Sequence, residues 1–231
     1  MANNSLIIQF KRVLSVNWLK SLYVNLYYFP IGKALHFPVL MGYNVKIESL
    51  GGRKAIEAPV VFGCICFGLK YDPFHMGYAN SYWNIEKGAS AVFKGTARFS
   101  KGTIFNIFSG GRVIVGNKFT SNANFLLSCA DRIEIGEDVL LGWNITIMDN
   151  DGGHTMRKVD SDEITNGARP IIIGNHVWIS AEASILKGSM IPAGSIIGYK
   201  SNVCGLKPST LNSIIAGNPA IVVKEGFAWE H

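Results

Sequence analysis

The sequence predicts an all-β protein, a left-handed parallel β-helix of hexapeptide repeats, and three observations lead to this fold. Aliphatic residues recur every six positions, at Ile173, Ile179, Ile185, Ile191, Ile197 and Val203. Glycine accounts for 25 of the 231 residues, well above the usual share of about 7%, which suits many tight turns. Charged residues make up only 16% and hydrophobic residues 48%, which is enough for a core. A β-sandwich would instead show strands spaced by about 8 to 12 residues.

The period of six has a direct structural meaning. Each hexapeptide forms one short strand and a turn, and three of them close a triangular coil of about 18 residues. The aliphatic residue points to the axis of the prism and stacks on its equivalent in the next coil, about 4.8 Å away. A second run, Ile135, Leu141 and Ile147, predicts earlier coils, and partial coils are indicated at Val115 and Ile85.

The first 40 residues lack this repeat and predict a separate appendage, residues 1–40, ahead of a β-helix domain over residues 41–226. Apolar residues from Ile7 to Tyr27 recur at helical spacing, and Pro30 and Pro38 end the segment. Its longest charge-free stretch, residues 21–32, is too short to span a bilayer. Two interpretations stay open: a basic amphipathic anchor in peripheral contact with a membrane, or a helical appendage packed on the main domain or another subunit.

Charge and cysteine content narrow the choice of partners. The net charge is +6, but the basic residues form no run and no nucleic-acid motif, so no nucleic-acid partner is predicted. The four cysteines lack zinc-site spacing, so no metal is predicted. No signal peptide is recognisable, which favours the cytoplasm, with the inner face of its membrane as the site for an anchored form.

The repeat is interrupted between Ile147 and Ile173 by a polar segment, residues 148–170, which predicts a projecting active-site loop. Insertions into a solenoid project from one face and often carry function. His154 is the candidate catalytic residue, because a neutral imidazole can accept a proton from a hydroxyl. Asp149 and Asp151 could orient this imidazole or bind a substrate hydroxyl, or they could simply satisfy the backbone of a turn.

The stretch DNDGGHTM…ITNGARPIIIGNHVWISAEASILKG resembles the hexapeptide-repeat O-acetyltransferases, the group that includes galactoside and maltose acetyltransferases. Within that group it is most similar to the branch that acetylates capsular and other surface polysaccharides. Ala123-Asn124-Phe125 matches the A-N-F segment of the family, Trp178 matches its V-W-I tryptophan, and residues 216–220 match its closing A-G-N-P element. The resemblance covers roughly half of the chain.

This resemblance implies transfer of an acetyl group from acetyl-CoA, as co-substrate, to a sugar hydroxyl of a surface polysaccharide or its precursor. It implies His154 as general base without a covalent acyl-enzyme, and a homotrimer with active sites between neighbouring subunits. The implied acceptor-binding residues are Asn124, Asp149, Asp151 and Trp178. The implied coenzyme-binding residues are Trp178, Ala181, Tyr199, Lys200 and Lys224.

Two positions depart from the family. Gly205 stands where the family has a lysine after its last repeat, and Ile221 replaces an arginine, so Lys200, Lys207 and Lys224 are candidate substitutes. Three alternatives to the leading hypothesis follow. The first is the same fold acting on a free sugar, an amino-sugar nucleotide or serine. The second is a zinc hydratase, which would need three histidine ligands. The third is a non-catalytic scaffold.

Overall fold

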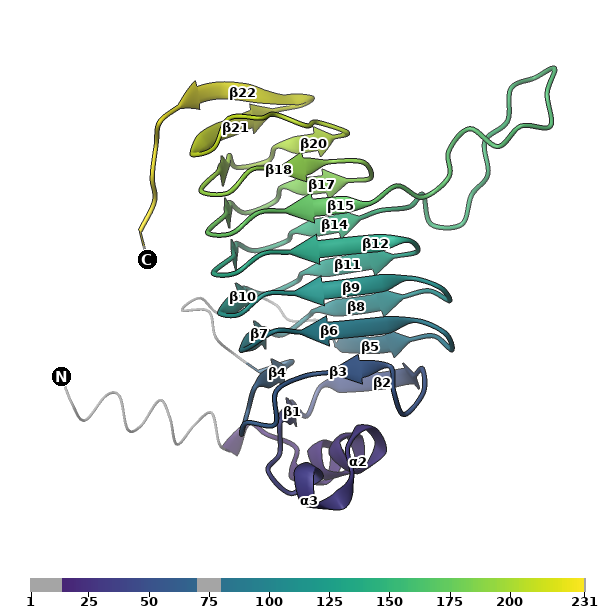
Figure 1. Ribbon diagram of the computed structural model, residues 1–231, viewed down its shortest axis with the longest axis vertical. Coiled ribbons are helices and arrows are strands. Elements are labelled where there is room, and N and C mark those ends of the chain that lie inside the picture. The colour runs from purple at the N-terminus through teal and green to yellow at the C-terminus, as the bar shows by residue number, and fades with distance from the viewer. Residues whose placement is uncertain (1–13, 70–79, 231) are drawn as a thin grey trace.

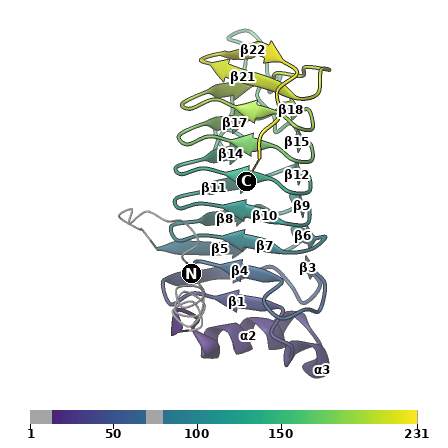
Figure 2. The ribbon, with the colours of Figure 1, turned by 90° about the vertical axis from the view of Figure 1, so that its left-hand side faces the viewer.

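The computed structural model describes residues 14–69 and 80–230, and their strands wind into a three-sided prism (Figures 1 and 2). The first face is a nine-stranded sheet of β1 (Val39–Met41), β4 (Ile65–Phe67), β7 (Ala97–Phe99), β10 (Phe119–Ser121), β13 (Leu140–Leu141), β16 (Trp178–Ile179), β19 (Ile196–Ile197), β21 (Ser213–Gly217) and β22 (Ala220–Glu225). The second face contains β2 (Val45–Leu50), β5 (Ser81–Ile85), β8 (Ile104–Ile107), β11 (Leu126–Cys129), β14 (Thr146–Met148), β17 (Ser184–Leu186) and β20 (Asn202–Cys204). The third face contains β3 (Ile56–Glu57), β6 (Ser90–Phe93), β9 (Arg112–Val115), β12 (Arg132–Ile135), β15 (Ile171–Ile173) and β18 (Met190–Ile191).

From β1 to β20, successive strands go to successive faces and each pairs in parallel with the strand one coil away, so the predicted left-handed β-helix is confirmed. The only antiparallel strand pair among the described residues is β21 with β22, a hairpin at the C-terminal end of the prism. The residues of the sixfold repeat are buried, each with its side chain on the axis.

The length of a coil decreases along the chain, as the pairing between neighbouring coils shows. Phe105 is paired with Leu127, and Leu127 is in turn paired with Ile147, which is slightly nearer in the sequence. Ile185 is paired with Val203, which is nearer still and corresponds to a coil of three hexapeptides. Coils of three hexapeptides therefore occur only at the end of the prism, because the earlier coils contain additional residues and show the sixfold spacing only in part.

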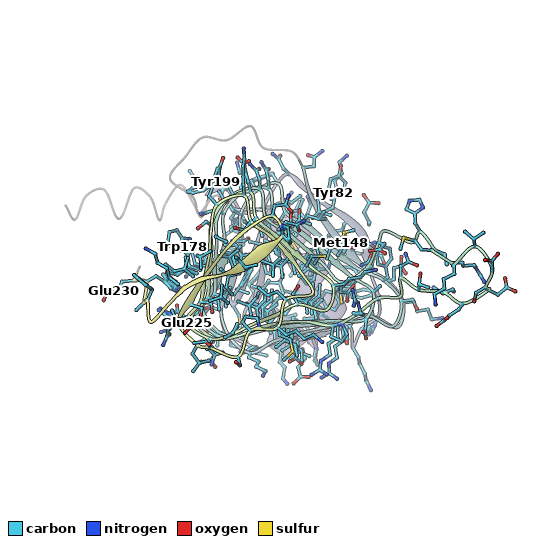
Figure 3. All side chains as sticks on the ribbon, turned by 90° about the horizontal axis from the view of Figure 1, so that it is seen from above. Tyr82, Met148, Trp178, Tyr199, Glu225 and Glu230 are labelled. Atoms are coloured by element: carbon cyan, nitrogen blue, oxygen red, sulfur yellow. The ribbon has the colours of Figure 1, made fainter. Side chains whose placement is uncertain are left out.

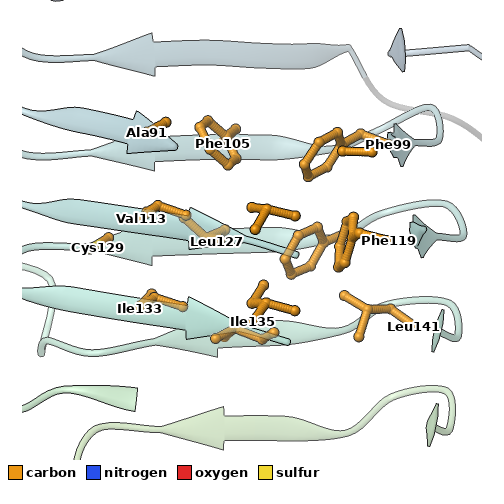
Figure 4. Close-up of a cluster of buried hydrophobic side chains, with 14 of the residues drawn as sticks. Ala91, Phe99, Phe105, Val113, Phe119, Leu127, Cys129, Ile133, Ile135 and Leu141 are labelled. Carbon is orange, nitrogen blue, oxygen red and sulfur yellow. The ribbon is translucent and has the colours of Figure 1, made fainter. Parts of the chain in front are cut away.

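Large aromatic side chains fill the early coils. Phe67 and Trp83 meet edge to face with centroids 5.0 Å apart, and Phe99 lies 5.5 Å from Phe105 and 5.0 Å from Phe119. Figure 4 shows this aromatic stack giving way to aliphatic side chains such as Leu141. A search for aliphatic residues at sixfold spacing could not detect these coils, because their inward positions hold phenylalanine and tryptophan.

Two short helices cover the N-terminal end of the prism (Figure 1): α2 (Trp18–Tyr28) and α3 (Ile31–Ala34). β1 is an edge strand, and α2 supplies hydrogen bonds to its backbone. The Asn25 amide group donates to the Val39 carbonyl at 2.7 Å and accepts from the Val39 N–H at 3.0 Å, and the Ser21 hydroxyl accepts from the Met41 N–H at 2.9 Å. These buried contacts satisfy backbone groups that an uncovered edge would leave unpaired.

β1 begins at Val39, two residues before the predicted start of the β-helix domain, and residues 1–13 of the predicted appendage lie outside the described residues. Neither helix of the described ranges has the length and apolar character needed to cross a bilayer. After β22, the C-terminal tail turns back along the first face (Figure 1).

Candidate active site

The loop that carries His154 leaves the prism between β14 and β15, at the corner between the second and third faces (Figure 1). β14 ends at Met148 and β15 begins at Ile171, so the connection comprises residues 149–170, and Met148, the first residue of the predicted loop, is the last residue of β14. An antiparallel bridge between Arg157 and Ile164 makes its outer part a hairpin. Nearly all of its residues are exposed, and the loop is therefore available to a large ligand or to another chain.

Asn166 organises the base of this loop, and sequence reasoning did not identify it. It is buried, and its amide nitrogen donates to the Asp151 carboxylate at 2.7 Å and to the His154 carbonyl at 2.8 Å. Its amide oxygen accepts from the Met156 N–H at 2.6 Å. Asn166 thus fixes the backbone at His154 and Met156 and holds the side chain of Asp151. A lone asparagine in a polar loop carries no sequence signal for this role.

The two predicted aspartates have different environments. Asp149 is fully buried, and its carboxylate accepts from the backbone N–H groups of Ala130 at 2.7 Å and Asp131 at 2.9 Å. These contacts correspond to the turn role and leave Asp149 away from any acceptor that binds at the surface of this chain. Hydrogen bonds from Lys187 and Asn166 hold the pKa of the Asp151 carboxyl below its usual value. Neither carboxylate contacts the imidazole of His154.

The imidazole of His154 is exposed and forms no hydrogen bond to the described residues. It borders a hollow of about 280 Å³ whose lining includes Phe108, Ala130, Asp151, Ile164 and Asn166. An uncharged imidazole beside such a hollow can accept a proton from a bound hydroxyl. Because no described residue holds the His154 ring, its orientation must come from a bound ligand or from a second chain.

A second hollow, of about 320 Å³, lies on the first face around Trp178. We call it the tryptophan groove, and it is lined by Asn122, Leu140, Gly142, Trp143, Trp178, Ser180, Ala181, Trp229 and Glu230. Within its lining, the backbones of Gly142 and Ala181 pack closely, because a Cβ on Gly142 would come within 2.6 Å of the Ala181 nitrogen. The Trp178 side chain is 36% exposed, as expected for an aromatic platform.

Trp229, in the C-terminal tail, forms one wall of the tryptophan groove and was missed at the sequence level. Its ring stacks on His176 with a centroid distance of 4.3 Å and an interplanar angle of 8°, and its Nε1 donates to the His176 carbonyl at 2.9 Å. His176 Nδ1 lies 2.7 Å from the Asp138 carboxylate, and this hydrogen bond raises the pKa of His176. The tail is therefore attached to the corner between the third and first faces.

The other predicted residues lie mainly at the corner between the first and second faces. The Asn124 amide donates to Asn144 at 3.1 Å, one coil away. The Tyr199 hydroxyl donates to Glu182 at 2.9 Å, and Lys200 Nζ lies 3.2 Å from the same carboxylate, which raises the pKa of Lys200. The positive charge of Lys200, which was predicted to bind the coenzyme, is thus partly neutralised by the Glu182 carboxylate.

Lys224 is further along the prism, in β22, with its ammonium 5.6 Å from the ring centre of Phe227. One chain does not bring all the predicted residues together. Viewed along the prism, Trp178 and Tyr199 lie on the side opposite Met148, the residue from which the His154 loop departs (Figure 3). A site that uses both the loop and the tryptophan groove therefore needs the loop of a second copy.

The cysteine thiols and any group of side chains that could bind a metal ion are the other potentially reactive features. Cys64, Cys66 and Cys129 are buried, and burial raises the pKa of Cys64 to about 11, so this thiol is protonated at neutral pH. Within residues 14–69 and 80–230, no group of three His, Cys, Asp or Glu side chains is arranged to hold a metal ion.

The amino-acid sequence of this chain is similar to those of several O-acetyltransferases. Over 121 residues, 52% of the chain, it is 32% identical to the polysialic acid O-acetyltransferase of Escherichia coli O1:K1 / APEC, of which it covers 38%. Over 121 residues, 50% of the chain, it is 32% identical to the galactoside O-acetyltransferase of Escherichia coli K12, of which it covers 55%. The predicted resemblance to the hexapeptide-repeat O-acetyltransferases is confirmed.

The chain spans about two fifths to about half the length of these curated hexapeptide-repeat relatives. The crystal structure of NeuO, a polysialic acid-specific acetyltransferase, is similar over 66% of this chain and 65% of that chain, with 28% identity and a TM-score of 0.51. The similarity of this chain to NeuO and to the polysialic acid O-acetyltransferase supports the predicted resemblance to the capsular polysaccharide branch of the hexapeptide-repeat acetyltransferases. No family model matches the sequence.

Proposed function

We propose that this protein is an O-acetyltransferase that transfers an acetyl group from acetyl-CoA to a sugar hydroxyl of a surface polysaccharide or its lipid-linked precursor. The observation that carries the proposal is the exposed His154 on the one long loop that interrupts the described coils. The similarity over 121 residues to an enzyme named for polysialic acid supports the choice of acceptor.

The proposed reaction is a direct acyl transfer without a covalent acyl-enzyme, and it proceeds by formation and breakdown of a tetrahedral intermediate. His154, uncharged, takes the proton of the sugar hydroxyl as its oxygen attacks the thioester carbonyl. Backbone N–H groups at the tight corners would stabilise the negative oxygen that forms. When the carbon–sulfur bond breaks, the imidazolium returns its proton to the leaving thiolate. The products are the acetylated sugar and the free thiol of coenzyme A.

We assign the donor to the tryptophan groove and the neighbouring corner. Trp178 offers an aromatic surface beside the small side chain of Ala181, and Tyr199 and Lys200 lie near the same corner. Asn124 lies on that corner in an earlier coil than Lys200, which makes it a candidate contact for either substrate. Lys224 is assigned a weaker role, because it lies in the terminal hairpin.

Because the His154 loop leaves the prism at the corner between the second and third faces, whereas the tryptophan groove lies on the first face, we propose a homotrimer in which each site combines the loop of one subunit with the groove of the next. Closed threefold symmetry would create three identical sites of this kind. Asp151, whose carboxylate is held by Lys187 and Asn166, would line the acceptor side.

Acceptors other than a polysaccharide are a second candidate. The similarity to galactoside O-acetyltransferase favours a smaller sugar as the alternative, again with a hydroxyl as the reacting group. A third candidate is a scaffold protein without activity. In that case no free thiol would be released from acetyl-CoA with any acceptor.

The test measures free thiol released from acetyl-CoA in the presence of polysialic acid, other capsular polysaccharides and simple galactosides. We expect release with at least one saccharide and a roughly hundredfold or greater fall in rate for His154→Ala. Val159→Ala, at the fully exposed tip of the same loop, is the matched control and should keep the wild-type rate. A His154→Ala protein with full activity contradicts the proposed base.

A further inference from the structure

The N-terminal end of the prism carries an apolar surface on helices that are already packed on their other side. In α2, Ser21, Val24, Asn25 and Tyr28 are buried against the prism. On the opposite side of the same helix, Leu19, Tyr23 and Leu26 are exposed, with 82% of the Leu19 surface free. A surface helix normally has a polar outer face, so a second apolar face indicates a contact.

The surface continues beyond α2. Ile31 and Leu35 are exposed at and just after α3, and Trp18 joins them to the prism through its stacked contact with Phe62. We call the set Trp18, Leu19, Tyr23, Leu26, Ile31 and Leu35 the end patch. It lies at the end of the prism remote from the terminal hairpin (Figures 1 and 2). It is thus distant from the tryptophan groove and the loop.

The N-terminal part of the sequence carries charge of one sign only. The first 47 residues contain no Asp or Glu, and they contain Lys11, Arg12, Lys20, Lys33 and Lys46. Among these, Lys33 is exposed in α3, whereas Lys20 donates to the carbonyls of Tyr43 and Val45. A surface that combines tryptophan, tyrosine and leucine with basic residues and lacks acidic ones complements an anionic lipid surface.

We infer that the end patch binds the surface of an anionic membrane. Contact along the surface is the only mode open to α2, whose 11 residues span about 16 Å against a hydrocarbon core of about 30 Å. The inference is independent of the proposed acyl transfer, since it concerns another part of the molecule. Binding through the end patch would hold the prism with its N-terminal end on the membrane.

The experiment is flotation of the full chain with vesicles of phosphatidylcholine alone or mixed with phosphatidylglycerol. We expect flotation with the mixed vesicles and a loss at high salt. Leu19→Glu and Leu26→Glu should each reduce the bound fraction roughly tenfold. Leu211→Glu is the matched control, because Leu211 is a comparably exposed leucine near the other end of the prism.

Three outcomes would overturn the inference. These are a wild-type protein that stays unbound, binding that the glutamate variants leave unchanged, and a Leu19→Glu protein that elutes as a smaller assembly. The last result would show that the end patch contacts a second copy of the chain. Thermal unfolding of each variant excludes loss of fold as the cause, and thiol release measured without vesicles tests the proposed function separately.

Discussion

At the scale of single residues, the reactive group and the group that positions it come from different parts of one loop. His154 is exposed, and its imidazole has no hydrogen-bond partner in the described ranges, while its backbone carbonyl is held by Asn166. Within this chain, the backbone of the loop therefore fixes where His154 lies, while the orientation of its ring depends on a ligand or a second chain. An error of about 1 Å at a reacting group can cost a factor of about a hundred in rate.

This dependence predicts the effect of Asn166→Ala. The substitution removes the bonds to Asp151, His154 and Met156, so the base of the loop should loosen. We expect kcat to fall by roughly 10- to 100-fold with little change in KM for acetyl-CoA. The unfolding temperature should stay close to that of the wild type, because the loop lies outside the prism. Steady-state kinetics with unchanged kcat would contradict the positioning role.

Trp229 permits a second prediction at this scale. Trp229→Ala removes one wall of the tryptophan groove and leaves Trp178, whose ring centre lies 6.3 Å from that of Trp229, in place. If the donor binds in this groove, the dissociation constant for coenzyme A should rise about tenfold, in the range lost with one aromatic contact. Isothermal titration with coenzyme A measures this directly. A variant that binds coenzyme A as tightly as the wild type would place the donor elsewhere.

The sequence singles out His154 because it lies in the polar segment that interrupts the repeat, and Trp178 because it matches the tryptophan of the resembled family; both roles stay predictions. It left two roles open for Asp149, and the structure favours the turn, with the carboxylate buried against backbone N–H groups. It could not identify Asn166 or Trp229. Their functions arise from contacts across 12 and 53 positions of the chain, which no local pattern encodes.

At the scale of elements, α2 replaces the strand that would otherwise pair with β1. Asn25→Ala removes its bonds to Val39 and leaves buried backbone groups of β1 without partners. We expect the free energy of unfolding to fall by about 2–3 kcal/mol. Leu26→Ala, on the exposed side of the same helix, should change it by less than about 0.5 kcal/mol. Urea unfolding compares the two, and equal effects would contradict the edge-capping role.

The attachment of the C-terminal tail should depend on pH. The Asp138 carboxylate raises the pKa of folded His176 above its ordinary value of 6.5, so this contact stabilises the fold below that pH. The stabilisation is lost as pH rises through the folded pKa. Asp138→Asn should therefore lower the unfolding temperature more at about pH 5.5 than at about pH 8.5. If the difference in unfolding temperature between the wild type and Asp138→Asn instead grows with rising pH, the contact between Asp138 and His176 does not stabilise the fold in this way.

The repeat predicted the later strands well because the coils there consist of three hexapeptides each and have aliphatic axial positions. The earlier coils were recognised only in part, since they contain additional residues and their axial positions hold Phe99, Phe105 and Phe119. Aromatic side chains stacked on the axis serve the same packing function as isoleucine. Their spacing, however, follows the sixfold rule only in part.

At the scale of the whole molecule, the proposed site is completed only by assembly. The loop leaves the prism at the corner between the second and third faces, whereas the tryptophan groove lies on the first face, so His154 of one subunit would act beside Trp178 of another (Figure 3). Neither the length nor the repeat of the sequence could predict which residues face each other between copies, because that depends on how the prisms pack.

The most direct measurement is complementation between two inactive variants. His154→Ala and Trp178→Ala proteins, co-expressed with different tags and purified as mixed assemblies, are assayed for thiol release from acetyl-CoA with a saccharide acceptor. Each variant alone should be nearly inactive, whereas the mixed assemblies should regain about a third of the wild-type rate, because each mixed trimer has one interface in three with both intact residues. Mixed assemblies no more active than the single variants would contradict a site shared between subunits.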